Sequence, residues 1–297
     1  MEEAIKQGFI LYGLSEHCPR SHNEDLYPEE VEAGLSPAAL EERFAAFLKE
    51  AWSLKEKYSG QIQLLIGLET EVIHGNDDLN ALLELIQRYG RKIEYVVGSV
   101  HHVHGIPIDF DQPTFLRALS ASASTPTPTH ETQATFLDAY FEAQYALITV
   151  LQPEIVGHID LCRLYDPSLQ LRDYPSAWSK LERNVRAATS YGALFECNAA
   201  ALRKSWITSY PGVDVLKLIL ELGGRLALSD DSHGPHAVGL NYTRMHTYLR
   251  EQGIDVVWKL ERSDTPNEAG RYVKAVKVER WWEDPFWNTE FRKAQNT

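Results

Sequence analysis

Six apolar stretches of this sequence each run directly into acidic or imidazole side chains. The segments in which they end are Leu14–His17, Ile66–Glu69, Gly98–His102, Val156–Asp160, Leu194–Asn198 and Leu228–His233. Short apolar runs bounded by polar residues predict buried strands. Ligand-type residues at the carboxyl ends of successive strands are how an α/β barrel builds an active site. Because carboxylates and imidazoles bind divalent ions, the pattern predicts a metal-dependent enzyme.

The candidate metal ligands share this position at a strand end, and they are His17, Glu69, His101, His158, Asp231 and His233. A single histidine there is more often a hydrogen-bonded structural residue, but six in register favour a ligand set. Asp231 and His233 are the strongest local pair, because alternate residues of an extended chain share a face. Glu71 competes with Glu69 for the same reason. Zinc, manganese and iron all suit such ligands.

Other acidic and imidazole residues have weaker claims. In an extended segment His102 and His104 point away from the face of His101, so we expect them at the rim or behind the ligands. Glu16 and Asp230 are candidates to orient a ligating imidazole. The remaining histidines lie in polar or helical contexts and are expected on the surface: His22, His74, His130 and His246.

The segments between these strands have helical periodicity. Ser36 and Pro37 are a plausible N-cap and first helical residue, and an apolar stripe follows them as far as Tyr58. Similar stripes cover about 79–89, 137–151, 178–188 and 213–220. Alternating strands and helices predict parallel strands with crossover helices. We favour a barrel over an open doubly wound sheet, because so many strands carry ligands.

We expect a single domain over residues 1–297, with two segments that depart from the alternation. Small polar residues and prolines at about 119–133 predict a low-complexity surface insertion. From about residue 255, Val256–Leu260 and Tyr272–Val276 predict two strands around a polar turn. The tryptophans that follow predict a packed terminal segment.

Composition narrows the classes of function. The chain has 29 lysines and arginines against 42 acidic residues, a net charge of −13. This balance argues against nucleic acid or an anionic membrane as the main partner, but it predicts nothing about oligomeric state. No apolar run reaches the roughly 18 residues needed to cross a bilayer, and the amino terminus has no signal pattern. Three scattered cysteines predict reduced thiols and a cytoplasmic location.

The motifs together resemble those of the PHP-domain (polymerase and histidinol phosphatase) proteins, most closely the monofunctional histidinol-phosphatases of the fungal type. The resemblance covers about residues 4–240. The segment His158–Arg163 and the pair Arg203 and Lys204 favour this subfamily. The matching segments are Gly13–Arg20, Leu26–Glu30, Gly67–Glu69, Gly98–Val103, Ile108–Asp111, Gly157–Leu164, Glu196–Asn198, Leu202–Lys204 and Ser229–His233.

The resemblance implies a distorted (β/α)7 TIM-like barrel with up to three divalent metal ions. In the family pattern Glu69 bridges two metals, His101 and His158 complete one of them, and Asp231 serves another. His17 with His233 serves the third. The implied reaction is hydrolysis of the small phosphorylated substrate L-histidinol phosphate, in histidine biosynthesis, with Asp231 and His233 as catalytic residues beside a metal-bound water.

For the substrate we expect phosphate contacts from Arg163, Arg203 and Lys204, because a guanidinium fork matches phosphate oxygens. A surface ion pair explains Lys204 nearly as well. Asn198 is expected to hydrogen-bond the substrate, and His236 is expected at the rim of the site.

The sequence also departs from the family pattern, which begins with a strand carrying a His-x-His pair. Here Glu2–Gly8 fits the helix after that strand, and the next strand follows at once. We therefore expect a barrel without its first strand, fewer bound metals, and weak activity or none. A start of the sequence assigned too late is favoured over a naturally shortened form. The alternatives are a non-catalytic relic that binds a phosphorylated metabolite or a partner, and an enzyme for another small phosphoester or a nucleotide.

Overall fold

A computed structural model describes residues 1–123, 129–204 and 206–288. Within these residues one sheet has the strand order β1-β2-β3-β6-β7-β8-β9-β10. Neighbouring strands are parallel from β1 to β9, and the last pair is antiparallel. The strands are β1 Leu11–His17, β2 Gln63–Glu69, β3 Tyr95–Gly98, β6 Ile155–Val156, β7 Leu194–Asn198, β8 Arg225–Ser229, β9 Val256–Arg262 and β10 Val273–Glu279. The six strands predicted to end near ligand-type residues are confirmed.

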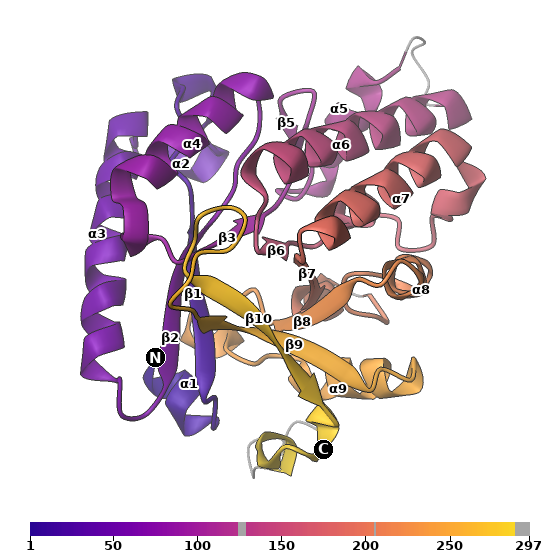
Figure 1. Cartoon of the computed structure of the whole chain (residues 1–297). Coiled ribbons are helices and arrows are strands. Elements are labelled where there is room, and N and C mark those ends of the chain that lie inside the picture. The colour runs from indigo at the N-terminus through magenta and orange to yellow at the C-terminus, as the bar shows by residue number, and fades with distance from the viewer. Residues whose placement is uncertain (124–128, 205, 289–297) are drawn as a thin grey trace.

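Helices run along the outer side of this sheet (Figure 1). They are α1 Glu2–Lys6, α2 Pro28–Glu32, α3 Pro37–Lys57, α4 Asn76–Tyr89, α5 Gln112–Ala121, α6 His130–Leu151, α7 Pro175–Ser190, α8 Val213–Glu221 and α9 Tyr242–Glu251. The predicted start of α3 is confirmed, because the Ser36 hydroxyl accepts a hydrogen bond from the amide of Ala39. The helices α5 and α6 extend into both ends of the insertion predicted at about 119–133, because α5 ends at Ala121 and α6 begins at His130. Residues 124–128 of this segment lie outside the described residues.

The sheet curls into the distorted barrel that the sequence predicts, with β1 at one edge and β10 at the other in the described part of the chain (Figure 1). Alternation along β2 builds two layers of core. Leu64, Ile66 and Leu68 join the large cluster under the helices, whereas Leu65 packs inside the curl with Tyr95.

Glycines let the aromatic ring of Tyr95 lie across two strands on the inner side of the curl. A Cβ atom at Gly13 would lie 2.5 Å from the Tyr95 hydroxyl, and one at Gly67 would lie 2.6 Å from its ring. Side chains at these two positions would displace the ring, so the close approach requires glycine. The result is a closely packed interior beneath the strand ends.

Tryptophan side chains pack together in the carboxyl-terminal part. The indole nitrogen of Trp281 donates to the carbonyl of Ile254 at 2.9 Å, and the Trp281 and Trp287 ring centroids are 5.3 Å apart. The three cysteines are free and buried. None of the described helices combines the length and apolarity that crossing a bilayer requires.

Candidate metal centre

The ends of β2, β3 and β6 bring together the side chains of Glu69, His101 and His158. The Glu69 Oε1 atom lies 3.4 Å from His101 Nε2 and 3.3 Å from His158 Nε2. The two Nε2 atoms are 3.2 Å apart. Three potential ligand atoms therefore converge on one point, although the residues are far apart in sequence.

A second carboxylate, Glu71, lies behind this group and contacts the His101 imidazole together with those of His17 and His102. Its Oε1 atom is 2.8 Å from His17 Nδ1, and its Oε2 atom is 3.4 Å from both His101 Nδ1 and His102 Nδ1. Because Glu71 contacts the Nδ1 side of His101, the Nε2 atom of that ring is left facing Glu69. Glu71 therefore orients an imidazole toward the centre, as carboxylates behind metal-ligating histidines do.

His102 lies closer to this centre than parity along an extended strand predicts. β3 ends at Gly98, and the chain then turns through the short pair β4 His102–Val103 and β5 Ile106–Pro107. The turn between β4 and β5 has positive φ at His104 and Gly105. Because residues 99–101 are not extended strand, consecutive histidines both reach Glu71.

The Glu71 carboxylate and the His17 imidazole each favour the charged form of the other. Burial alone would raise the pKa of Glu71, but His101, His102 and His17 hold that pKa well below its usual range. Burial alone would lower the pKa of His17, whereas Glu71 and Glu69 raise it to about 9. A divalent cation bound beside these carboxylates would take the place of the proton on His17.

The donor set and its spacing fit a divalent metal ion. Two Nε2 atoms that face each other at 3.2 Å share room for a single proton, so one of them presents a lone pair. In a tetrahedral zinc site with bonds of about 2.0–2.1 Å, ligand atoms lie roughly 3.4 Å apart. The spacing around Glu69 Oε1 is close to that value.

Replacing Glu71 by glutamine is expected to lower both metal affinity and any metal-dependent activity by roughly 10–100-fold, because the imidazoles lose the carboxylate that orients them. Metal titration and initial rates on the purified Glu71→Gln variant measure the two effects. Wild-type affinity in this variant would contradict the orienting role.

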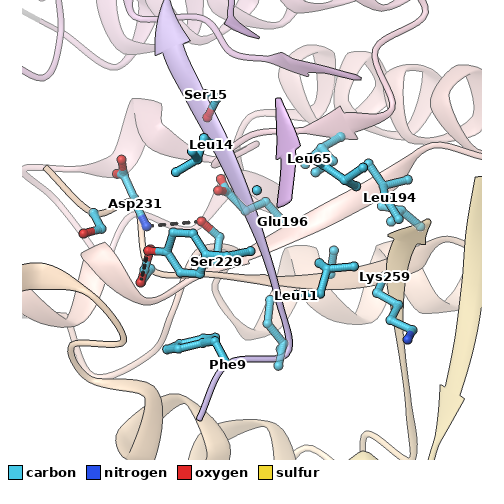
Figure 2. A pocket seen from close by; sticks show the side chains of 18 of the residues that line it. Phe9, Leu11, Leu14, Ser15, Leu65, Leu194, Glu196, Ser229, Asp231 and Lys259 are labelled. Atoms are coloured by element: carbon cyan, nitrogen blue, oxygen red, sulfur yellow. Dashed lines mark hydrogen bonds between the residues drawn. The ribbon is translucent and has the colours of Figure 1, made fainter. Parts of the chain in front are cut away.

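The centre opens into a cavity of about 630 Å³ inside the curled sheet. His17, Glu69, Glu196, Asp231 and His233 belong to its lining. Figure 2 shows Ser229 and Asp231 on one side of the cavity and Leu65 and Leu194 on the other. The cavity therefore presents charged groups together with an apolar wall.

Asp231 and His233 line this cavity, but among the described residues they fall outside the two closely spaced groups around Glu69 and Glu71. Asp231 has φ of 48°, and its Oδ2 accepts from the Asn198 amide at 3.4 Å. His233 Nδ1 is 3.0 Å from the Asp231 carbonyl, and its side chain is 67% exposed. Their roles as metal ligands and catalytic residues stay predictions.

Glu196 belongs to this region and was not among the predicted ligands. Its Oε2 atom accepts from the backbone amide of His158 at 2.9 Å and from the Asn198 side chain at 3.1 Å. Burial raises the pKa of Glu196 against the opposing charge of His158. Alternation along β7 places Glu196 on the same face as Asn198, and this pattern was the available sign of its position.

The predicted substrate contacts have different surroundings. Arg203 Nη2 donates to the Asp231 carbonyl at 3.0 Å, which places its exposed side chain at the cavity edge. Lys204 and His236 are exposed. Arg163 is buried and pairs with Asp160 and with Asp214, so its guanidinium is already held by two carboxylates. A phosphate contact from Arg163 stays a prediction that these contacts do not favour.

Glu16 and Asp230 were candidates to orient a ligating imidazole, but in the described part of the chain the hydrogen bonds that they accept come from other groups. Glu16 Oε1 accepts from the backbone amide of His17 at 2.9 Å. Asp230 accepts from the Tyr12 hydroxyl at 2.6 Å and from the Gly239 amide at 2.6 Å. Asp230 therefore links β1 to the segment after β8.

Comparisons with known proteins agree with this architecture. The PHP domain family model matches residues 1–200. The chain is 42% identical to the Schizosaccharomyces pombe protein named "Probable histidinol-phosphatase", over 95% of this chain and 89% of the relative. It is 30% identical to the histidinol-phosphatase of Saccharomyces cerevisiae, over 97% of this chain and 92% of the relative.

Solved structures share the fold. The hisK protein of Listeria monocytogenes superposes with a TM-score of 0.68 at 21% identity, over 82% of this chain and 90% of that one. Histidinol phosphate phosphatase of Lactococcus lactis, solved with zinc, L-histidinol and phosphate, has a TM-score of 0.61 at 16% identity, over 92% of this chain and 90% of that one. The chain belongs to the PHP family, among its histidinol-phosphatases.

Proposed function

We propose that this chain hydrolyses L-histidinol phosphate to L-histidinol and inorganic phosphate in histidine biosynthesis. The observation that carries the proposal is the convergence of Glu69, His101 and His158 at one end of a ligand-sized cavity, in a member of this family. A volume of about 630 Å³ falls in the range of small-molecule sites.

Four residues near the strand ends are the groups that would hold metal: His17, Glu69, His101 and His158. Asp231 and His233 line the same cavity and would contribute further ligands there. Bound metal ions polarise phosphoryl oxygens and lower the pKa of a coordinated water. Two imidazoles with a carboxylate, and a neighbour solved with zinc, support zinc as the ion in this chain.

The protein's own charges govern how a phosphate approaches. Glu69, Glu196 and Asp231 place carboxylates around the cavity, which would repel a dianion in the absence of compensating cations. Arg203 at the edge supplies a fixed positive charge, and the Asn198 amide offers a hydrogen-bond donor that now contacts Glu196 and Asp231. We propose that these two residues orient the substrate.

The free buried cysteines support a cytoplasmic location for the reaction.

The proposal is tested by phosphate release from L-histidinol phosphate with added zinc or manganese. We expect release by the wild type and a loss of roughly 10²–10³-fold in Asp231→Asn, because a carboxylate charge beside the cavity is removed. Asp264→Asn, in the exposed turn between β9 and β10, is the matched control.

Other results would redirect the assignment. Metal binding without release, with every phosphoester tried, would identify a non-catalytic member of the family. Faster release from another small phosphoester or from a nucleotide would replace L-histidinol phosphate as the substrate.

A further inference from the structure

A separate group of metal-type side chains, which does not belong to the cavity lining, consists of His22, Asp25 and His74. We propose that this His22–Asp25–His74 cluster binds a divalent cation of the zinc class. His22 and Asp25 lie in the loop that follows β1, and His74 lies in the loop that follows β2. The sequence predicts exposed histidines at both positions, which is confirmed, but not their convergence on one carboxylate.

The ligand atoms of the cluster lie within bonding reach of one ion. His22 Nδ1 is 3.2 Å from Asp25 Oδ2, and His74 Nε2 is 2.8 Å from Asp25 Oδ1. One atom from each of the three side chains lies within 4.8 Å of the others. Since tetrahedral zinc spaces its ligands by roughly 3.4 Å, small rotations of the imidazoles suffice to bind it.

Hydrogen bonds hold both loops in place before any ion binds. The Asp78 carboxylate accepts from the backbone amides of Ile73 and His74, at 2.5 and 2.6 Å. The backbone amide of Asp25 donates to the His22 carbonyl at 3.3 Å in a short 3-10 turn. The carboxylate of Asp25 is buried, whereas both imidazoles are exposed. The cluster thus combines a fixed anionic ligand with two rings accessible to an ion and to water as a fourth ligand.

The local charge also favours a cation. Although slight burial opposes its charged form, Asp25, Asp78 and Glu24 raise the pKa of His74, which reflects a negative potential at this position. A bound cation would join the loop after β1 to the loop after β2. These loops lead away from His17 and Glu69, so the ion would brace the chain beside the catalytic cavity and add stability through binding.

The experiment measures zinc bound per full-length chain after dialysis against fixed free zinc, together with the thermal midpoint. Glu69→Gln/His158→Ala weakens the cavity site and serves as the background. We expect this background variant to bind one more zinc ion per chain than the same protein carrying His22→Ala/His74→Ala. We also expect zinc to raise the thermal midpoint of the background variant by more than it raises that of the protein without the two imidazoles. His104→Ala/His130→Ala, at two other exposed histidines, is the matched control and keeps the ion.

Phosphatase activity separates this site from the proposed function. His22→Ala/His74→Ala in the otherwise wild-type chain is expected to lose one zinc ion and to keep kcat/KM for L-histidinol phosphate within about twofold under saturating zinc. The single change His74→Gln keeps a polar side chain, and it is also expected to weaken zinc binding at this cluster. Equal zinc content and equal midpoint shifts with and without the two imidazoles would overturn the proposal and leave a hydrogen-bonded His–Asp–His network.

Discussion

Glu69→Gln is expected to reduce phosphate release from L-histidinol phosphate by roughly 10³-fold, because several kcal/mol of transition-state stabilisation depend on the metal centre. Glu69 Oε1 faces both His101 Nε2 and His158 Nε2. An amide in its place removes the negative charge and leaves a weaker ligand. Steady-state kinetics and metal content measured on the same preparation give the size of the effect.

The matched control for this change is Glu50→Gln, on the exposed side of α3. It removes the same charge from the acidic chain without touching the cavity. Wild-type rate and wild-type metal content in Glu69→Gln would show that the convergence around Glu69 is not the metal centre. Loss of metal together with rate, in Glu69→Gln alone, is the expected pattern.

Arg163→Met is expected to lower the free energy of unfolding by about 3–5 kcal/mol, the usual cost of removing one partner of a buried ion pair. Asp160 is fully buried, accepts from Arg163 and from the Gly212 amide, and would keep an unpaired charge in the variant. Denaturant unfolding of the wild type and the variant measures the difference.

Kinetics distinguish this structural role from the phosphate contact that the sequence analysis predicts for the guanidinium of Arg163. A rise in KM with unchanged unfolding free energy would favour the phosphate contact and contradict the anchoring role. Arg183→Met is the matched control, because Arg183 pairs with Glu142 at the surface between α6 and α7. Exposed pairs contribute about 0–1 kcal/mol, so this change is expected to have little effect on stability.

Much of the fold was predictable because its determinants are local. A short apolar run that ends at Glu69 or Asn198 predicts a strand and its end, since the pattern requires only neighbouring residues. The N-cap at Ser36 follows from the same kind of evidence. Parallel order follows from the alternation of strands and helices, and the barrel was favoured because so many strands end in ligand-type residues.

Pairing at the site was less predictable, because the partners of a polar side chain come from distant segments. Arg163 in sequence fits a phosphate contact, yet Asp160 and Asp214 hold it in the structure. Glu71 was expected to compete with Glu69, and instead contacts the opposite side of the His101 ring. Because β2 ends at Glu69, Glu71 lies beyond the strand and parity within the strand does not describe its position.

Residue type and spacing were enough to predict a metal-dependent enzyme and strand-end ligands such as His17 and Glu69, because backbone periodicity places them at one end of the sheet. The PHP family came from the resemblance of the motifs to those of known proteins. Folding in three dimensions set the distances between them, buried Glu71 behind the imidazoles, and joined His22 and His74 through Asp25. Such contacts depend on how separate loops pack, and sequence spacing carries no information about distances between side chains on different loops.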